Sequence, residues 1–178
     1  MAWTALAPER FVFLDETATP TTLTPTMGRA PRGQRVVGRV PRGHRPQISW
    51  LATLTRQGIG PSLVVEGAVD RDVFETFVEH ELAPTLRPGQ IVVLDNLSVH
   101  KSAAARQAIE AVGCQLVFLP TYSPDFNPIE QAFAKAKQRL RRLEARTFDT
   151  VVAAVGEALM TITPGDCAGF FRAAGYLT

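Results

Sequence analysis

Three acidic residues stand where predicted strands end or a predicted helix begins. Asp15 follows the apolar run FVFL (11–14), Asp95 ends the run IVVLD (91–95), and Glu130 lies in the first turn of the helix after CQLVFLP (114–120). Ligands of α/β sheets bind beyond the carboxyl ends of strands, so these side chains can share a site if the first and fourth strands are neighbours. Strand alternation points Asp15 and Glu16 to opposite faces, so only one of the two can join that site.

Such a group of carboxylates has a definite chemistry. Three of them in one place repel one another and raise each other's pKa unless a cation lies between them. Mg²⁺ and Mn²⁺ prefer oxygen ligands and commonly combine carboxylates with water and substrate phosphate. Two such ions ~4 Å apart would activate an attacking oxygen and stabilise the leaving one. The pattern therefore predicts a site for two Mg²⁺ or Mn²⁺ ions that serves phosphoryl transfer.

The same residues also fit simpler structural roles. Asn127, Pro128 and Glu130 occupy the N-cap, first and third positions of the predicted helix, an arrangement that forms a capping box without any metal. Asp95 followed by Asn96 is ordinary turn chemistry. Spacing alone leaves both interpretations open.

Positive charge is concentrated in two stretches, although the formal net charge is only +2. The stretches hold 12 of the 19 Lys and Arg residues. They comprise Arg29, Arg32, Arg35, Arg39, Arg42 and Arg45, and then Lys135, Lys137, Arg139, Arg141, Arg142 and Arg146. Clusters of this kind suggest a polyanionic partner, DNA or RNA first, with solvated surface faces as the alternative. Lys137 and Arg141 share a helix flank with Glu130. This is the arrangement expected if Glu130 binds a metal ion and the two cations contact a DNA backbone that passes beside it.

The order of elements predicts an α/β protein with helices on both faces of one sheet and parallel middle strands. Gly and Pro punctuate residues 20–46, which favours a long hairpin or arm. The expected strands cover 11–14, 47–58, 60–67, 91–95 and 114–120, and the expected helices cover 70–86, 101–113, 128–146, 147–162 and 164–175.

Bulk properties place the chain among soluble single-domain proteins. Its 178 residues suffice for one core. No run approaches the ~18 apolar residues of a membrane span, and the N-terminal segment does not resemble a signal peptide. Cys114 and Cys167 are isolated, which fits reduced thiols in a cytoplasm and argues against structural zinc.

Three segments resemble the motifs of the DDE transposases: FLDET (13–17), VLDNLSVHKS (93–102) and LPTYSPDFNPIEQAFAKAK (119–137). They are most similar to the bacterial insertion-sequence branch of the mariner-like superfamily, in which 34 residues typically separate the second and third acids, as between Asp95 and Glu130. The arm GRAPRGQRV and the ending CAGFFRAAGY are similar as well. The resemblance implies a ribonuclease H-like mixed sheet, with three N-terminal antiparallel strands followed by parallel ones, and Asp15, Asp95 and Glu130 as metal ligands.

The resemblance also extends to residues beside the three acids. His100 completes a DNxxxH pattern that starts at Asp95 and Asn96; it would orient a phosphate or metal-bound water, or make a structural hydrogen bond. Lys101 would contact the DNA backbone or remain solvated. Phe133 stands where many relatives carry Trp. Only about ten residues precede the first motif, too few for the helix-turn-helix region of relatives, so a separately encoded half or a decayed remnant is expected.

The resulting prediction is a transposase catalytic domain that cuts DNA and joins its freed 3′-hydroxyl to target DNA, at a TA step by resemblance. The expected organisation is one domain over 1–178, with a core over 11–146, a basic arm over 28–46 and C-terminal helices over 147–178. Expected partners are element ends, target DNA and a second copy on DNA, without a membrane, in a bacterial cytoplasm near the nucleoid. A DNA-binding remnant is the alternative. A haloacid dehalogenase-type phosphotransferase ranks last, because Thr17 stands where that family needs a second Asp.

Overall fold

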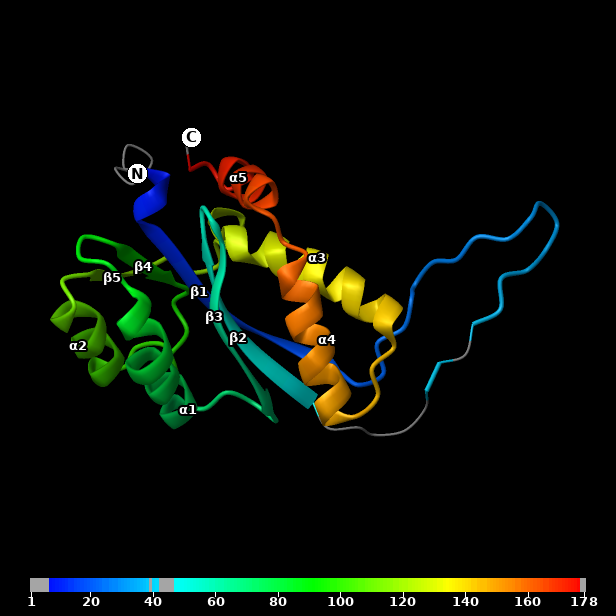
Figure 1. Cartoon of the computed structure of the whole chain (residues 1–178), viewed down its shortest axis with the longest axis horizontal. Coiled ribbons are helices and arrows are strands. Elements are labelled where there is room, and N and C mark those ends of the chain that lie inside the picture. Colours follow the sequence, from blue (N-terminus) through cyan, green and yellow to red (C-terminus); the bar gives the residue numbers. More distant parts are fainter. Residues whose placement is uncertain (1–6, 39, 42–46, 177–178) are drawn as a thin grey trace.

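A five-stranded mixed sheet forms the centre of the protein (Figure 1). The computed structural model describes residues 7–38, 40–41 and 47–176. The strands are β1 (Phe11–Pro20), β2 (Gln47–Thr55), β3 (Gly58–Glu66), β4 (Ile91–Leu94) and β5 (Gln115–Phe118), in the order β3-β2-β1-β4-β5. The first three strands are antiparallel, whereas β4 is parallel to both β1 and β5. The predicted mixed α/β sheet is confirmed, and the condition for a shared site is met, because β1 and β4 are neighbours.

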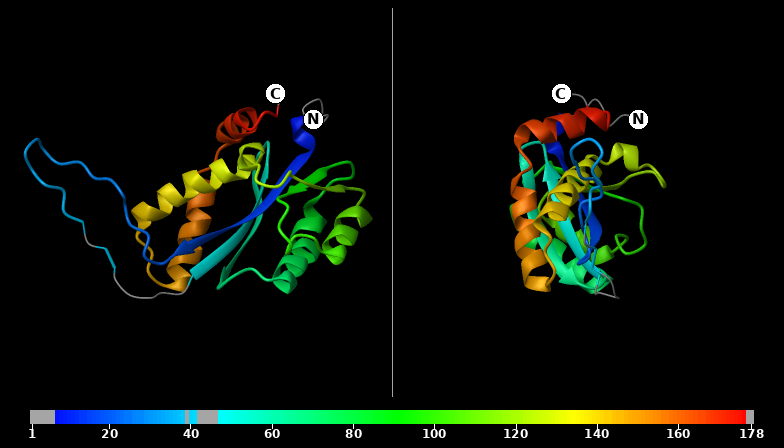
Figure 2. Two further views of the ribbon diagram at one scale, coloured as in Figure 1. Left: turned by 180° about the vertical axis from the view of Figure 1, so that it is seen from behind. Right: turned by 90° about the vertical axis from the view of Figure 1, so that its right-hand side faces the viewer.

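Helices cover both faces of this sheet (Figure 2). One face packs against α1 (Arg71–Thr76), a π-helical turn η3 (Phe77–Leu82), a 3-10 turn η4 (Ala83–Thr85) and α2 (Ala103–Ala111). The other packs against α3 (Pro128–Leu143), α4 (Phe148–Met160) and α5 (Pro164–Ala173). Two short 3-10 turns complete the chain, η2 (Pro8–Arg10) and η5 (Pro124–Phe126). Because successive strand residues alternate, Phe11 and Phe13 point to the α3 face while Val12 and Leu14 point to the α1 face.

Aromatic rings fix α3 and the C-terminal segment on the sheet. The rings of Trp50 and Phe133 meet edge to face at 4.9 Å, and the indole N–H of Trp50 donates to Thr19 Oγ1 at 3.0 Å. Phe13 meets Phe171 at 5.3 Å in the same manner. Such pairs contribute about 0.5–1.5 kcal/mol each beyond their burial. Phe133 therefore fills a core position, and it holds the helix that carries Glu130 against the sheet.

The helix α3 has one apolar stripe, as the helical spacing of Ile129, Phe133, Ala136, Leu140 and Leu143 predicts, with Leu143 only partly buried. Ile129, Phe133, Ala136 and Leu140 are buried at helical spacing, whereas the cations lie on the other flanks. The helix ends at Glu144, which adopts a left-handed conformation with φ 50°. The burial of this stripe fixes the rotation of α3 on the sheet.

The chain between β1 and β2 forms the predicted arm, which extends away from the body (Figure 1). Its described residues contain no helix. A turn at its tip has Gly33 at φ +86°, and Gln34 N donates to Pro31 O at 3.0 Å. A Cβ built on Gly28 would lie 2.6 Å from Val36 Cγ1, so the two limbs touch there and need glycine. Arg39, Arg42 and Arg45 lie outside the described residues.

Two predicted elements differ in extent. The first strand was expected to end at Asp15, but β1 continues to Pro20 because β2 pairs with it throughout that stretch, from Asp15–Ala52 to Pro20–Gln47. The expected helix over 70–86 divides into α1, the π-helical turn and the 3-10 turn. Asp15 therefore lies inside a strand rather than at its end. The pairing with β4 stops at Phe13, so Asp15 lies beyond the last β1–β4 pair.

The outer edge of the sheet is irregular. The pairing of β2 with β3 shifts register between Ala52 and Leu54, and Thr53 Oγ1 donates to Pro61 O at 3.1 Å. A Cβ on Gly60 would lie 2.5 Å from Thr53 Oγ1, so this close approach requires glycine. The opposite edge strand, β5, has only four residues.

In the described part of the chain, no single helix is long and apolar enough to cross a membrane. Only when α4 and α5 are taken together do they reach the length and apolar composition of a membrane span, and the two helices are bent by 80° relative to each other.

Candidate active site

Asp15, Asp95 and Glu130 line one cavity of about 400 Å³. The wall between them is formed by the segment after β4, the segment after β5 and the start of α3; it comprises Asn96, Leu97, Ser98, Leu119, Pro120, Thr121, Tyr122, Ser123, Pro124 and Asn127. The fold thus brings together the three acids that the sequence singles out, because β1 and β4 are neighbours and α3 starts across them.

Asp15 is the buried member of the group, with 4% of its surface exposed. Its Oδ1 accepts a hydrogen bond from the backbone N–H of Glu16 at 2.7 Å, and its Oδ2 accepts one from the side-chain amide of Asn127 at 2.8 Å. Burial raises the pKa of Asp15 to about 7; the Glu16 N–H opposes this effect, while the charges of Asp95 and Glu130 add to it. A nearby cation would relieve this destabilisation of the charged form.

Asp95 is held in place by a hydrogen bond with His100. The imidazole Nδ1 lies 2.5 Å from Asp95 Oδ1, and the backbone N–H of Leu97 donates to the same oxygen at 3.1 Å. Burial alone would raise the pKa of Asp95, but these hydrogen bonds outweigh it and lower the pKa. His100 is fully buried, and its ring lies 4.8 Å from that of Phe74. Its observed contact is therefore with Asp95, and its burial keeps it from direct contact with a bound nucleic acid.

Glu130 is exposed at the rim of the cavity. The capping box that would explain it without a metal does not form, since no side-chain hydrogen bond caps α3 in the described structure. Asn127 occupies the N-cap position, but its amide donates to Asp15 instead. The contact of Asn127 with Asp15 thus replaces the local capping hydrogen bond, and the Glu130 side chain remains free to face the cavity.

The donor set fits Mg²⁺ or Mn²⁺ in its chemistry, because carboxylate oxygens are the ligands that these ions prefer. Asp15 and Asp95 are already oriented by hydrogen bonds. Among the residues that the structure describes, no three His, Cys, Asp or Glu side chains converge closely enough to hold a metal ion as they stand. Joint ligation therefore requires these side chains to move closer together than they lie in this structure.

Two further contacts were not anticipated from the sequence. Asn127 links α3 to Asp15, and Lys137 Nζ contacts Thr17 Oγ1 on β1. Burial lowers the pKa of Lys137, an effect that the charge of Glu130 opposes and that of Arg141 reinforces. These charge effects agree with the expectation that Glu130, Lys137 and Arg141 lie on one flank of α3. Glu16 points to the other face as predicted, and its Oε2 is buried without a hydrogen-bond partner in the described structure.

Of the other predicted residues, Asn96 belongs to the cavity wall, whereas Lys101 and the described arm cations do not line the cavity. Asn96 Nδ2 donates to Thr121 Oγ1 at 3.1 Å and so joins the segments after β4 and β5. Lys101 is exposed and does not line the cavity. The described arm cations, Arg29, Arg32 and Arg35, are exposed as well.

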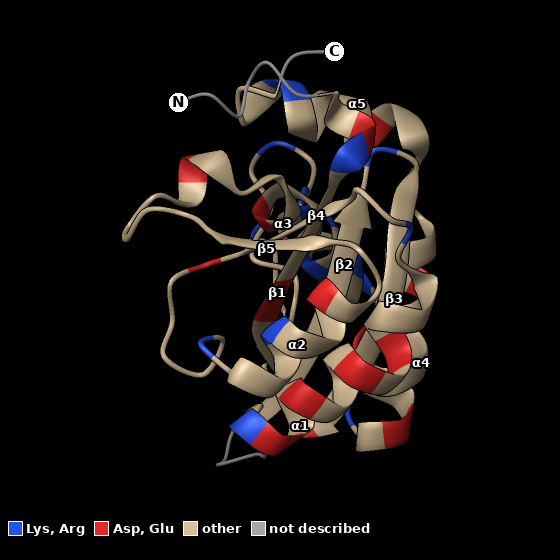
Figure 3. Ribbon diagram, turned by 90° about the vertical axis from the view of Figure 1, so that its left-hand side faces the viewer, with Lys and Arg blue, Asp and Glu red and all other residues tan. Residues whose placement is uncertain are grey.

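Charge differs between the two helical faces. The segment at α1 and η3 is mostly acidic, with Asp70, Asp72, Glu75, Glu79 and Glu81 against Arg71 (Figure 3). The Lys and Arg residues of the second predicted cluster lie on α3 and just after it. The second basic stretch thus lies on the helical face that also carries Glu130 at the start of α3, which favours the polyanion interpretation for that stretch.

Comparison with known proteins agrees with this geometry. Residues 10–152 match the DDE superfamily endonuclease family. The transposable element Tcb1 transposase of Caenorhabditis briggsae is 25% identical over 135 residues, which cover 67% of this chain and 50% of that protein. The Mos1 transposase in its paired-end complex with the left transposon end superposes with a TM-score of 0.72 at 17% identity, covering 93% of this chain and 51% of that one. The catalytic domain of Mos1 mariner transposase superposes with a TM-score of 0.58 at 14% identity, and the superposition covers 96% of this chain and 84% of that one.

The fold and the family match define a DDE-type nuclease domain. This chain belongs to the DDE superfamily endonucleases, and its fold is that of the Mos1 transposase catalytic domain. It spans about half the length of the Tcb1 transposase and of the Mos1 chain in the paired-end complex. The haloacid dehalogenase alternative is thereby excluded.

Proposed function

We propose that this chain is the catalytic domain of a transposase, which cuts DNA and transfers the freed strand with divalent metal ions held by Asp15, Asp95 and Glu130. The observation that carries the proposal is that all three carboxylates line one cavity, with Asp15 buried and its pKa raised to about 7. Two ions are proposed, Mg²⁺ or Mn²⁺, and the choice between the metals is left to the experiment.

Each residue has a defined part in this proposal. The ions, when bound, would activate an attacking oxygen and stabilise the leaving oxygen at the scissile phosphate. Asn127 holds Asp15 in position, and His100 orients Asp95. Lys137, fixed beside Thr17 on the flank of Glu130, supplies positive charge for the phosphate. The amino-terminal end of α3 carries partial positive charge that favours an anion near Glu130.

The proposed reaction has two steps. Water attacks the phosphorus at an element end and the P–O3′ bond breaks, which leaves a 3′-hydroxyl and a 5′-phosphate. That hydroxyl then attacks a phosphodiester of target DNA, joining the strands and releasing a new 3′-hydroxyl in the target. Neither step needs a covalent bond to the protein.

Other parts of the proposal concern partners. The relatives are about twice as long, which supports recognition of the element ends by a segment beyond the printed sequence, encoded with it or separately. A homodimer on DNA would pair two ends, and the exposed Val36 and Val37 of the arm are apolar surface for such a contact. Action on DNA favours a bacterial cytoplasm and its nucleoid, with 1–178 acting as one catalytic domain.

Calorimetric titration with Mn²⁺ tests the metal site without needing the element ends. Asp95→Asn and Glu130→Gln should each weaken Mn²⁺ binding by about tenfold or more, since each removes a ligand charge. Asp125→Asn is the matched control, because Asp125 lies in the neighbouring turn η5 but does not line the cavity. If Glu130→Gln leaves the affinity unchanged, the third carboxylate is lost from the mechanism and a DNA-binding remnant becomes the better account.

A further inference from the structure

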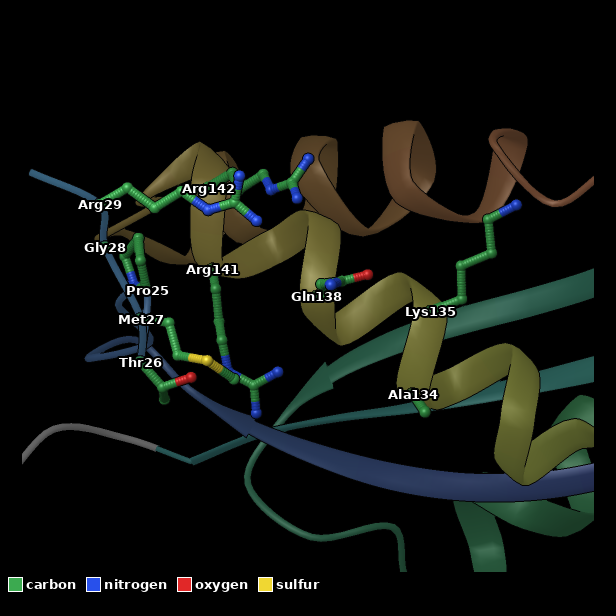
Figure 4. A pocket seen from close by; sticks show the side chains of 10 residues that line it. All are labelled: Pro25, Thr26, Met27, Gly28, Arg29, Ala134, Lys135, Gln138, Arg141 and Arg142. Atoms are coloured by element: carbon green, nitrogen blue, oxygen red, sulfur yellow. The ribbon is translucent and has the colours of Figure 1, made fainter.

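A second cavity lies on α3 at the opposite end from Glu130 (Figure 4). It has a volume of about 730 Å³, and we call it the arm-root groove. It lies between the first residues of the arm and the stretch of α3 from Ala134 to Arg142. Its lining is Pro25, Thr26, Met27, Gly28, Arg29, Ala134, Lys135, Gln138, Arg141 and Arg142. Figure 4 shows Arg29 and Arg142 on one side of the groove and Arg141 on the other, beside Met27 and Thr26.

The arm side of the groove is anchored to the end of the helix. The guanidinium of Arg146, just after α3, donates to Leu23 O at 2.8 Å and to Thr21 O at 3.3 Å. Leu23 packs against the core beside α3. The arm root is therefore fixed where it passes α3, so the groove is a feature of the folded body and does not depend on where the arm tip lies.

The groove carries uncompensated positive charge. Among the described residues its lining contains no Asp or Glu, and Arg29, Arg141 and Arg142 have no carboxylate within salt-bridge distance. The neighbouring cations are different: Lys135 pairs with Asp166 at 2.5 Å, and Arg139 pairs with Glu157. Three free guanidinium groups on two facing segments favour an extended anion over a single small one.

We propose that the arm-root groove binds the sugar–phosphate backbone of duplex DNA about five nucleotides from the bond on which the carboxylate cavity acts. For a duplex whose axis runs along α3, the position follows from the length of the helix. Arg141 lies 11 residues after Glu130, which corresponds to about 16 Å along the axis. One strand of B-DNA carries a phosphate every ~3.4 Å of axis, so about five phosphates separate the two ends of α3. The inferred position rests on the proposed function, whereas anion binding by the groove does not.

Backbone contact, rather than base recognition, suits the groove because guanidinium groups on an open surface pair with phosphate whatever the sequence. Lys137 lies between the two ends of the helix and feels the charges of both Glu130 and Arg141. A strand that follows α3 would thus meet Lys137 on its way from the cavity to the groove.

The salt dependence of binding to a short duplex of arbitrary sequence tests the groove. The double variant Arg141→Gln, Arg142→Gln should lower the slope of log K against log salt by about two, since each lost phosphate contact contributes about 0.9. The control is Arg139→Gln, which removes a cation of the same helix that Glu157 already neutralises, and it should leave the slope nearly unchanged. An unchanged slope in the double variant, or an equal fall in the control, overturns the proposal. Thermal melts establish that each variant is folded.

The position is tested with duplexes that carry one neutral methylphosphonate at successive steps from a recessed 3′ end, in the presence of Mn²⁺. Neutralising about the fifth phosphate should weaken binding to the native chain but not to the double variant. Sensitivity at every step alike, or persisting in the double variant, overturns the position. If the cavity does not hold metal, the salt slope still reports on the groove, so failure of the groove and failure of the proposed function give different results.

Discussion

One helix, α3, ends in two opposite environments. At its start, carboxylates gather in a cavity where Asp15 is buried and tied to Asn127. At its far end, exposed or half-exposed arginines border the arm-root groove without acidic partners among the described residues. The difference teaches that substitutions at the two ends of α3 affect different quantities, namely the free energy of folding at the start and the affinity for a partner at the far end. Buried charge is coupled to folding free energy, whereas exposed charge is screened by salt and acts chiefly on association.

The largest expected effect concerns pH and Asp15. Its pKa rises from 3.8 to about 7 on folding, so the folded chain binds the proton more tightly, and stability is lost as pH rises through that window. Without metal, the loss reaches at most about 4 kcal/mol. Urea unfolding at a series of pH values measures it. Asp15→Asn should remove this part of the pH dependence, and Mn²⁺ at pH 8 should restore stability to the native chain alone. A native profile that matches the variant's would contradict the burial argument.

Removing the Asn127 amide should have the next largest effect. Asn127→Ala leaves Asp15 Oδ2 buried without its donor, which costs about 1–3 kcal/mol. Denaturant unfolding gives the value. Asn96→Ala serves as the control, because its hydrogen bond to Thr121 lies at the surface and its loss should cost about 0.5 kcal/mol or less. Equal losses in the two variants would mean that Asn127 does not support the carboxylate.

Changes to the arm should alter association and leave folding unchanged. Arg32→Gln with Arg35→Gln should lower the salt slope of DNA binding by about two. Unfolding free energy should stay within about 0.5 kcal/mol, because both side chains are exposed. The comparison pair is Arg71→Gln with Arg106→Gln, on helices of the opposite face. A slope that persists without the arm arginines would remove the arm from the DNA interface.

The smallest expected effect adds charge to the groove. Asp166 pairs with Lys135 and also accepts hydrogen bonds at the start of α5, and these contacts lower its pKa to about 2. Asp166→Asn would free Lys135, so the salt slope should increase by less than one unit. The stability that this carboxylate provides is present above pH 4 and is lost as pH falls toward 2. A slope that stays unchanged in the variant would show that Lys135 takes no part in DNA binding by the groove.

The sequence predicted those features that depend on local pattern. Alternation placed Asp15 and Glu16 on opposite faces, and helical spacing predicted the buried stripe from Ile129 to Leu140. The apolar runs before Asp95 and Pro120 predicted parallel strands, and the pairing of β4 with β1 and β5 confirms this. These features follow from periods of 2 and 3.6 residues, which are visible in a single chain.

The remaining features depend on long-range contact, which no local pattern encodes. The extension of β1 beyond Asp15 comes from pairing with β2 across the arm. Asn127 occupies a cap position by sequence, yet its amide binds a carboxylate 112 residues away. The arm-root groove exists because Arg146 binds carbonyl groups more than 120 residues earlier in the chain. The capping interpretation of Asn127 was therefore wrong for a tertiary reason.

The irregular edge of the sheet has a consequence for how copies of this protein meet. An exposed edge strand invites another chain to add to it and so to aggregate. Here one edge strand contains Pro61 and Gly60 at a register shift, and the other has four residues. Proline offers no N–H for strand addition, and a short strand gives little length to pair. Both edges of the sheet are thereby poor templates for pairing with the sheet edge of another molecule in a crowded cell.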